Sequence, residues 1–523
     1  MRSVKDKREY NVVVVGGGTA GWLTAAIIAA ERRAQGDQET RVTLVESPDV
    51  PIIGVGEGTW PSMRRTLQRI GLSENVFLAQ TGASFKQGTR FVNWSGRGDG
   101  DCYDHPFSAP VAYASQNLAP TWLSHGGEKS FSEFVSPQSA LIDAGLAPKQ
   151  AMTPEYAFAV NYGYHLDAGK FAALLQTHST DNLGIEHRRA NVVEVKEDGA
   201  GGSDTDIAAL RLDSGDLLEG DLFIDCTGHR ALLLGEHYGV GMIGVDSVLF
   251  NDRAVAVQVK YAQADTPIAS ATLSTATSMG WIWDIGLQER RGLGHVFSSR
   301  FSSETDARTV LEDYVSADER LASHKLEDDA YRTLKFTPGY RSEFWRRNCV
   351  AVGLSAGFIE PLEASAIALV EQSAAMIAEQ LPQDRTIMDV VAKRFNEKFT
   401  YHWQRIIEFL KLHYAVSARN DSDYWRAHID PASWPESLKE KLLLWQQQPP
   451  YHSDAPMIDE LFPSASYQYV LYGMGFRPRF GRVSAATAEL ENVLHEVQTQ
   501  RQKLLAGLDA NRSLINELLG NHP

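Results

Sequence analysis

The sequence predicts an α/β protein with a nucleotide-binding, mixed-sheet body and a mainly helical C-terminal cap. Three observations support this fold class. A buried strand, a glycine-rich turn and a helix follow one another over residues 11–30, and short strand-like stretches recur as far as residue 352. From about residue 387, a helical spacing of apolar residues replaces the strand pattern. We therefore place the body at residues 1–386 and the cap at residues 387–523.

The glycine-rich turn near the N-terminus is the strongest local signal. Four consecutive valines, 12–15, are typical of a buried strand, and a helical pattern starts at Trp22. Between them the glycines follow the spacing G-x-G-x-x-G, which lets the backbone approach a pyrophosphate at the positive end of a helix. The residues of this turn predicted to bind a dinucleotide are Gly16, Gly18, Thr19, Ala20 and Gly21.

A second strand, 41–46, ends in a carboxylate. Glu46 lies 25 residues beyond Gly21 in the sequence, and an acidic residue near this spacing binds a ribose hydroxyl in dinucleotide-binding folds. An ordinary βαβ unit with a glycine-rich turn is the alternative. The motif by itself does not separate NAD from FAD.

Composition limits the possible partners and compartments. A formal charge of −16 argues against binding to nucleic acid or to an anionic membrane. Three widely spaced cysteines form neither a disulfide framework nor a CxxC metal site, which favours a reducing compartment. No apolar run approaches the ~18 residues of a membrane span, and the N-terminus does not resemble a signal peptide. We expect a soluble cytoplasmic protein without a bound metal.

The rest of the body alternates short elements. Residues 51–61 are a glycine-rich loop, and the region 110–150 has no clear pattern. Predicted helices cover 62–70, 74–80 and 365–380, with 393–416, 438–446 and a stripe over 485–519 in the cap. Predicted extended stretches cover 84–94, 191–197, 207–213, 217–224, 254–261, 282–287 and 349–352.

Two later turns favour FAD over NAD. Strand-like stretches run into Thr227–Gly228 and into the segment 353–357, and large FAD proteins of the flavin monooxygenase-like, Rossmann type return the chain to the cofactor in this way. No second G-x-G-x-x-G motif follows a strand. Reduced flavin would therefore have to come from another protein.

Several motifs together resemble the flavin-dependent tryptophan halogenases and their indole-halogenating relatives, in the family's order over residues 11–476. Residues 16–22, GGGTAGW, resemble the FAD motif, and residues 53–59, IGVGEGT, resemble the flavin strap. Residues 281–286, WIWDIG, match the signature W-x-W-x-I-P except that glycine replaces proline. Residues 409–414, FLKLHY, resemble a helical segment of the family. Lys86, in SFKQGTRFVNW, and Glu363, in FIEPLEASAIA, fall where the family keeps its catalytic lysine and glutamate.

The resemblance implies a reaction and a set of site residues. Reduced FAD and oxygen would oxidise chloride or bromide, and the Lys86 ammonium would polarise the resulting hypohalous acid. Glu363 would take the proton from the ring or hold the halogenating species. An ion-paired strand lysine and a helix-capping glutamate are the ordinary alternatives. Further cofactor-binding candidates are Gly54, Val55, Gly56, Glu57, Gly353 and Ile359, and further substrate-binding candidates are His105, Phe107, Pro361 and Phe462.

Two stretches depart from the family pattern. Ser365 and Ala366 stand where the family binds halide with a Thr-Gly pair; they keep the backbone amides and add a Cβ. The late segment 451–476 is short, lacks a Tyr-Tyr strap, and has Met457 where tryptophan-specific members carry a carboxylate. A zwitterion would then lack charged partners, so we expect an indole-like substrate rather than free tryptophan.

Three functions stay open at this point. The first is a two-component halogenase, monomeric or homodimeric, that receives reduced FAD from a separate NAD(P)H-dependent flavin reductase. The second is a flavin-dependent aromatic hydroxylase on the same fold. The third is a non-catalytic flavin-binding protein. Trp281 and Trp283, which alternate on one strand, would separate flavin from substrate in the first reading and be plain core residues in the others.

Overall fold

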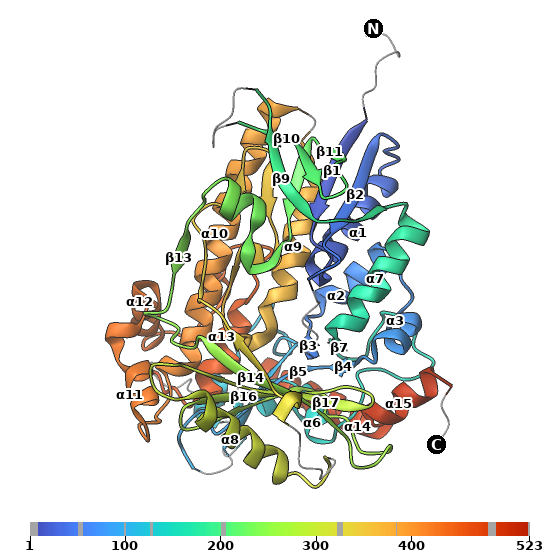
Figure 1. The fold of residues 1–523 in the computed structure, drawn as a ribbon. Coiled ribbons are helices and arrows are strands. Elements are labelled where there is room, and N and C mark those ends of the chain that lie inside the picture. Colours follow the sequence, from blue (N-terminus) through green and yellow to red (C-terminus); the bar gives the residue numbers. More distant parts are fainter. Residues whose placement is uncertain are drawn as a thin grey trace.

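The computed structural model describes residues 9–50, 56–98, 101–125, 129–199, 205–321, 328–382, 384–479 and 488–520. In Figure 1 the two larger sheets of this part of the chain lie toward opposite ends of the view, and two helices, α9 (Ser365–Glu379) and α10 (Arg385–Ala415), run between them. A continuous buried apolar core includes residues from the N-terminal strand and from the late helices.

The nucleotide-binding half is a six-stranded sheet built around the four-valine strand. Its order is β20 (Trp345–Arg346), β21 (Cys349–Ala351), β12 (Leu222–Asp225), β1 (Tyr10–Val15), β2 (Thr40–Glu46) and β8 (Glu186–Arg189). The four central strands and β8 run parallel, and β20 is antiparallel to β21. The helix α1 (Thr19–Ala34) packs against α7 (Ala168–Leu183) and α9. The predicted FAD-binding α/β architecture is thus present.

The second half is a seven-stranded mixed sheet. Its order is β18 (Arg332–Lys335), β14 (Arg253–Lys260), β17 (Arg290–Phe297), β16 (Gly280–Gly286), β15 (Thr272–Ala276), β5 (Gly88–Val92) and β6 (Cys102–Pro106). Helix α8 (Glu304–Ser316) covers β14 and β17. Every residue of β16 is buried, because both of its faces are covered.

Three small sheets complete the strands of the described residues. One consists of β3 (Gly56–Gly58), β7 (Gly163–Asp167) and β4 (Ser84–Lys86), with β7 in the middle and antiparallel to both neighbours. The others have the orders β11 (Leu217–Glu219), β10 (Ile207–Leu212), β9 (Val192–Glu197) and β13 (Met242–Gly244), β19 (Gly339–Arg341), β22 (Gly357–Phe358).

The remaining helices lie in two parts of the chain, and among them α2 (Ser62–Arg69) packs on α1 and α9 while α3 (Glu74–Thr81) packs on α7. In the body they are α2 and α3 together with α4 (Ala119–His125), α5 (Phe131–Val135) and α6 (Gln138–Asp143). After α10 they are α11 (Asp423–Ile429), α12 (Glu436–Trp445), α13 (Ser464–Gly473), α14 (Ala488–Gly507) and α15 (Asn511–Leu518). The late helices pack on body elements: α13 on β6, α14 on α5 and α6, and α15 on β4. The division of the chain at residues 386–387 stays a prediction.

Some predicted elements are divided in the structure. The extended stretch 84–94 supplies β4 to one sheet and β5 to another, and the stretch 217–224 contains β11 and β12. The stripe 485–519 is two helices, because the chain between them pairs with the segment 145–147: Ala147 N–H donates to Asp509 O (2.8 Å) and Asn511 N–H donates to Gly145 O (2.9 Å). Residues 51–55 of the glycine-rich loop 51–61, which include Gly54 and Val55, lie outside the described residues.

Candidate active site

A single cavity of about 900 Å³ connects the glycine-rich turn to the strand that carries Lys86. Most residues predicted for cofactor, halide and catalysis line it although they come from distant parts of the chain. They are Gly16, Gly18, Thr19, Ala20, Glu46, Gly56, Glu57, Lys86, Gly353, Ile359, Pro361, Glu363, Ser365 and Ala366. A cavity of this size is typical of a site for a cofactor or another large ligand.

The turn between β1 and α1 has the geometry of a pyrophosphate cradle. Gly18 is the N-cap residue that precedes α1, and it has no side chain to cap the helix. A Cβ on Gly16, whose φ is +115°, would lie 2.3 Å from the carbonyl oxygen of Cys226, and one on Gly21 would lie 1.8 Å from that of Gly16. Glycine is therefore required at positions 16 and 21, because a neighbouring backbone oxygen leaves no room for a Cβ. The uncapped amides and positive helix end fit an anionic group.

Glu46 lies beside this cradle. Its Oε1 is 2.9 Å from Nε2 of His187, and a Cβ on Gly17 would collide with its Oε2. The carboxylate is thus held at the end of β2 next to the turn, where a ribose would follow the pyrophosphate. Gly353, with φ +74°, approaches Ala20 so closely that a Cβ would lie 2.8 Å from it. Together these residues fit the FAD predicted from the sequence.

Lys86 ends β4 and is buried, with 1% of its surface exposed. Its Nζ lies 5.3 Å from the centroid of the Phe107 ring and 3.0 Å from the position of a Cβ on Gly58. Within the described residues, the ammonium makes no hydrogen bond or ion pair. Burial lowers the pKa of Lys86 to about 8, although the charge of Glu363 acts in the opposite direction.

Glu363 is held from three directions. Its Oε1 is 2.6 Å from Nδ1 of His105 and 3.1 Å from Nε2 of His413, and its Oε2 accepts from the hydroxyl of Thr89 at 3.3 Å. Its backbone is left-handed, with φ +66°, a strained conformation found where geometry is imposed by function. Burial would raise the pKa of Glu363, but the pair of adjacent histidines, by charge and by hydrogen bonding, holds it well below its usual range.

The predicted substrate-binding residues fall into two groups. Pro361 lines the cavity, and Phe107 lies over Lys86. His105, Phe107 and Phe462 are not among the residues that line the cavity. Both ring nitrogens of His105 are engaged, because Nε2 lies 2.9 Å from Oγ of Ser466 while Nδ1 contacts Glu363. His105 therefore has no nitrogen left for a substrate and positions the carboxylate.

Three aromatic rings, those of Phe462, Phe409 and Trp60, pack together near Glu363. The Phe462 ring stacks on Phe409 with centroids 3.9 Å apart and meets the edge of Trp60 at 4.9 Å. The indole N–H of Trp60 donates to the carbonyl oxygen of Glu363 at 2.7 Å. Trp60 had no sequence signal, because its role depends on a contact with a residue 303 positions away.

The remaining predicted residues also line the cavity. Ser365 and Ala366 begin α9, and the preceding N-cap residue, Ala364, provides no side-chain cap, so the first-turn amides are available to an anion. Trp281 and Trp283 form part of the cavity wall. The Trp281 N–H donates to Oε2 of buried Glu360 at 2.7 Å, which fixes the ring. Trp281 and Trp283 therefore line the cavity and are not core residues alone.

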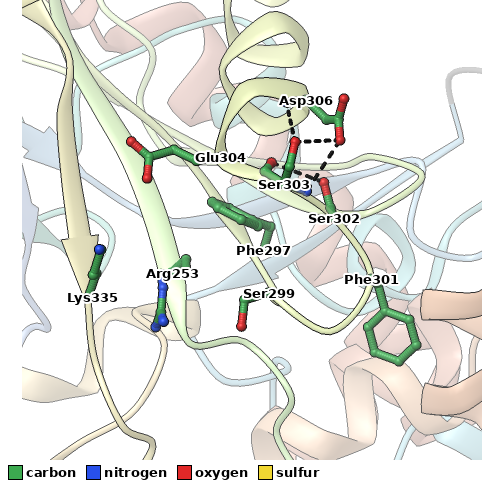
Figure 2. Close-up of a pocket in the computed structure, with 9 residues that line it drawn as sticks. All are labelled: Arg253, Phe297, Ser299, Phe301, Ser302, Ser303, Glu304, Asp306 and Lys335. Atoms are coloured by element: carbon green, nitrogen blue, oxygen red, sulfur yellow. Dashed lines mark hydrogen bonds between the residues drawn. The ribbon is translucent and has the colours of Figure 1, made fainter.

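A second, shallower pocket of about 570 Å³ lies at the start of α8 (Figure 2). Arg253 and Lys335 contribute positive charge to it, but Arg253 pairs with Asp252 at 3.0 Å. Ser303 and Asp306 form the capping box of α8. Its polar groups thus serve local structure, and we assign no function to it.

Among the described residues, no helix is long and apolar enough to cross a bilayer, and no cluster of side chains is suited to hold a metal ion. The cysteines Cys102, Cys226 and Cys349 are free thiols.

The fold and the cavity together define an FAD-dependent enzyme of the α/β class. A model of the tryptophan halogenase family matches residues 11–489, and the chain belongs to that family. It is therefore a flavin-dependent halogenase, as the sequence predicted.

Relatives with a stated activity align with this chain over nearly its whole length. The chain is 30% identical to tryptophan 6-halogenase ThaL of Streptomyces albogriseolus, over 98% of this chain and 99% of the relative. A tryptophan halogenase structure from Shewanella frigidimarina is 46% identical, with a TM-score of 0.92 over 99% of both chains. The flavin-dependent halogenase BrvH from Brevundimonas is 32% identical, with a TM-score of 0.84 over 98% of this chain and 100% of that one.

Proposed function

We propose that this enzyme transfers an oxidised chloride or bromide to an indole-like aromatic ring, with Lys86 as the delivering group and Glu363 as the base. The observation that carries the proposal is the shared cavity: the uncapped end of α1 and both side chains line the same space. When bound, reduced FAD with oxygen would supply the oxidising equivalents that turn halide into hypohalous acid.

The residues of the chain would then act in sequence. The first-turn amides at Ser365 and Ala366 would hold the halide. The buried ammonium of Lys86, which has no protein partner among the described residues, would donate to the hypohalous oxygen and polarise the oxygen–halogen bond. The Glu363 carboxylate would accept the proton released by the ring. Trp281 and Trp283 would keep the aromatic substrate away from the cofactor.

The segment 451–463 supports an indole-like substrate rather than free tryptophan. Each of its carboxylates is engaged: Asp454 with the Trp445 N–H, Asp459 with Lys398, and Glu460 with the Tyr401 hydroxyl. Met457 is 39% exposed and offers no charge. An ammonium entering here would lose water without gaining an ionic partner. The wall of Phe462 and Trp60 offers aromatic contacts instead.

A single-turnover assay tests the proposal. The enzyme is mixed with reduced FAD, oxygen and bromide, and with either indole or tryptophan, and products are identified by mass spectrometry. We expect bromide-dependent haloindole and a much smaller yield from tryptophan. Hydroxylated product formed without halide would instead assign a hydroxylase, and flavin oxidation with no product from any aromatic compound would assign a non-catalytic flavin protein.

Three further features belong to this proposal. A separate NAD(P)H-dependent flavin reductase would supply the reduced FAD, since the sequence has no second dinucleotide motif after a strand. Three unpaired cysteines favour the cytoplasm. The assembly would be a monomer or a homodimer.

A further inference from the structure

His413 is a buried histidine of α10 whose protonation can be worked out from its contacts. None of its surface is exposed. Its Nδ1 lies 2.9 Å from the carbonyl oxygen of Phe409, one turn earlier in the helix. A carbonyl oxygen only accepts hydrogen bonds, so Nδ1 carries a hydrogen. The other ring nitrogen, Nε2, faces Oε1 of Glu363 at 3.1 Å.

One proton must lie between His413 and Glu363. Without it, a ring-nitrogen lone pair would face a carboxylate oxygen across a hydrogen-bonding distance in a buried site, which is repulsive. The proton sits either on Nε2, giving an imidazolium and a carboxylate, or on the carboxyl group beside a neutral ring. The pair is neutral overall in both cases, which is what burial requires.

The other groups around Glu363 decide where the proton sits. His105 meets both of its contacts as a neutral ring, with Nδ1–H donating to Oε1 and Nε2 accepting from Ser466. The other charged or titratable groups facing the carboxyl are the Lys86 ammonium and the hydroxyl of Tyr103. Lys86 forms no ion pair with it. The contacts of His105 therefore require no second ring proton, whereas the contact of His413 with Glu363 does require one, and the rings packed around His413 are those of Phe91, Trp94 and Phe409.

We propose that His413 is a positioning residue that, as an imidazolium, keeps Glu363 ionised and leaves its Oε2 as the oxygen that receives the substrate proton. The role of that oxygen rests on the proposed function. During substitution the ring carbon–hydrogen bond breaks, its electron pair restores the aromatic ring, and the proton passes to Oε2. A neutral Glu363 beside an imidazolium then releases this proton readily to water, which restores the resting pair.

Infrared spectroscopy of the ligand-free protein tests the charge state without any turnover. We expect no carbonyl band of a protonated Glu363 near neutral pH in the parent, a band in His413→Phe, and its loss in the double variant His413→Phe/Glu363→Gln. If His413→Phe does not fold, His413→Gln replaces it, because glutamine can donate a hydrogen bond but carries no charge. The proposal is overturned if the folded variant shows no such band, or if the parent already shows it.

A matched control is available on the same helix. His402 is also fully buried, and neither of its ring nitrogens has a hydrogen-bond partner among the residues that the structure describes, so His402→Phe should leave the Glu363 band absent and halogenation unchanged. In His413→Phe, halogenation at pH 7 should fall at least about tenfold and recover as the pH rises, because a carboxyl deprived of its counter-charge ionises only at higher pH. An infrared band that appears in His413→Phe but not in the parent, together with no halogenase activity of the parent, would refute the proposed function and leave the charge assignment standing.

Discussion

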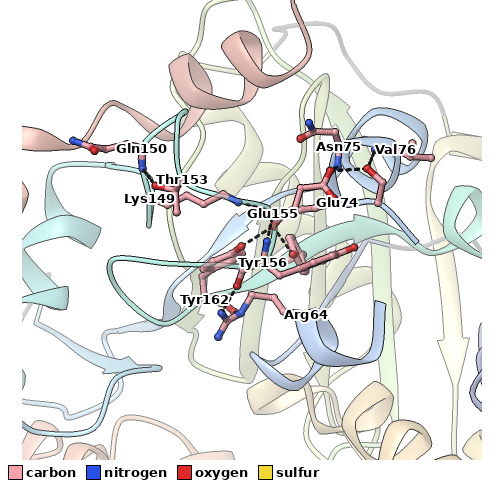
Figure 3. A network of polar contacts seen from close by, with 12 residues as sticks. Arg64, Glu74, Asn75, Val76, Lys149, Gln150, Thr153, Glu155, Tyr156 and Tyr162 are labelled. Carbon is pink, nitrogen blue, oxygen red and sulfur yellow. Dashed lines mark hydrogen bonds and ion pairs between the residues drawn. The ribbon is translucent and has the colours of Figure 1, made fainter. Parts of the chain in front are cut away.

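Two buried lysines lie on either side of strand β4 and have opposite surroundings. Lys149 and Lys86 are both 1% exposed. The Nζ of Lys149 is 2.5 Å from Oε2 of Glu74, and Oε1 of that glutamate accepts from the hydroxyls of Tyr162 and Tyr164, both at 2.6 Å (Figure 3). Lys86 has a carboxylate nearby in Glu363 but does not touch it.

The difference separates a structural charge from a functional one. At Lys149 the charge is paired directly with Glu74, whose two carboxylate oxygens are engaged by protein groups, so the pair joins the segment before β7 to the start of α3. At Lys86 the carboxylate is held away by two histidines, and the ammonium faces a cavity with its hydrogen-bonding capacity unused by the described residues. A buried lysine kept apart from its counter-charge is thus prepared to bind a transient oxygen ligand.

The sharpest way to break this comparison is Lys86→Met, which keeps the apolar stem and removes the charge. We expect halogenation to fall by about a thousandfold, within the range for losing a positioned proton donor. The free energy of unfolding should not fall, because no ion pair is lost and a desolvated charge is removed. Single-turnover yield, FAD binding and urea unfolding measure the three quantities. If Lys86→Met kept its activity, Lys86 would have a structural role like that of Lys149 and no catalytic one.

Lys149→Met is the matched change on the other side of β4. It strands Glu74 as a buried carboxylate beside two tyrosine hydroxyls, and we expect a loss of about 3–5 kcal/mol in the free energy of unfolding. Below the unfolding transition, FAD binding and the rate of halogenation per folded molecule should stay close to the parent's. A specific loss of activity at unchanged stability would contradict the structural assignment of Lys149.

The pH dependence of halogenation tests whether the reaction requires the charged form of Lys86. Burial lowers the pKa of Lys86 to about 8, so the fraction of ammonium is constant well below pH 8 and falls about tenfold per unit above it. The rate should follow this alkaline limb. In Glu363→Gln the limb of the residual rate should move to lower pH, because the carboxylate charge raises the pKa of Lys86. A rate that stays flat to pH 10 in the parent would show that the ammonium is not required.

How far the sequence could predict this site depends on which chemical groups form it. The cofactor end is made by consecutive residues, 16–21, whose backbone fixes the geometry, so a local motif was enough to predict it. The other end is made by side chains from β4, β5, β6, α10 and the turn before α9. For Lys86 the local pattern favoured an exposed, ion-paired lysine, and its burial follows from packing between β7 and α15.

The clamp on Glu363 could not be predicted from local pattern at all. His105 lies 258 positions and His413 lies 50 positions from it in the sequence. His413 falls within the segment FLKLHY that resembles the family, yet nothing in that segment indicates that the ring faces Glu363. His105 was predicted to line the substrate pocket, and the structure instead engages both of its nitrogens within the protein. The signal for both histidines is a shared contact, which exists only once the fold is known.

The smallest expected effect comes from the aromatic ring over each lysine. Phe107 lies 5.3 Å from Nζ of Lys86, and Phe85 lies 5.7 Å from Nζ of Lys149. Phe107→Leu should remove a cation–π attraction of roughly 0.5–2 kcal/mol and so lower the pKa of Lys86, moving the alkaline limb of halogenation down by roughly 0.4–1.5 units. Phe85→Leu should leave that limb in place and lower stability through lost packing. A rise in KM for indole with an unmoved limb in Phe107→Leu would show that this ring contacts the substrate and does not tune the ammonium.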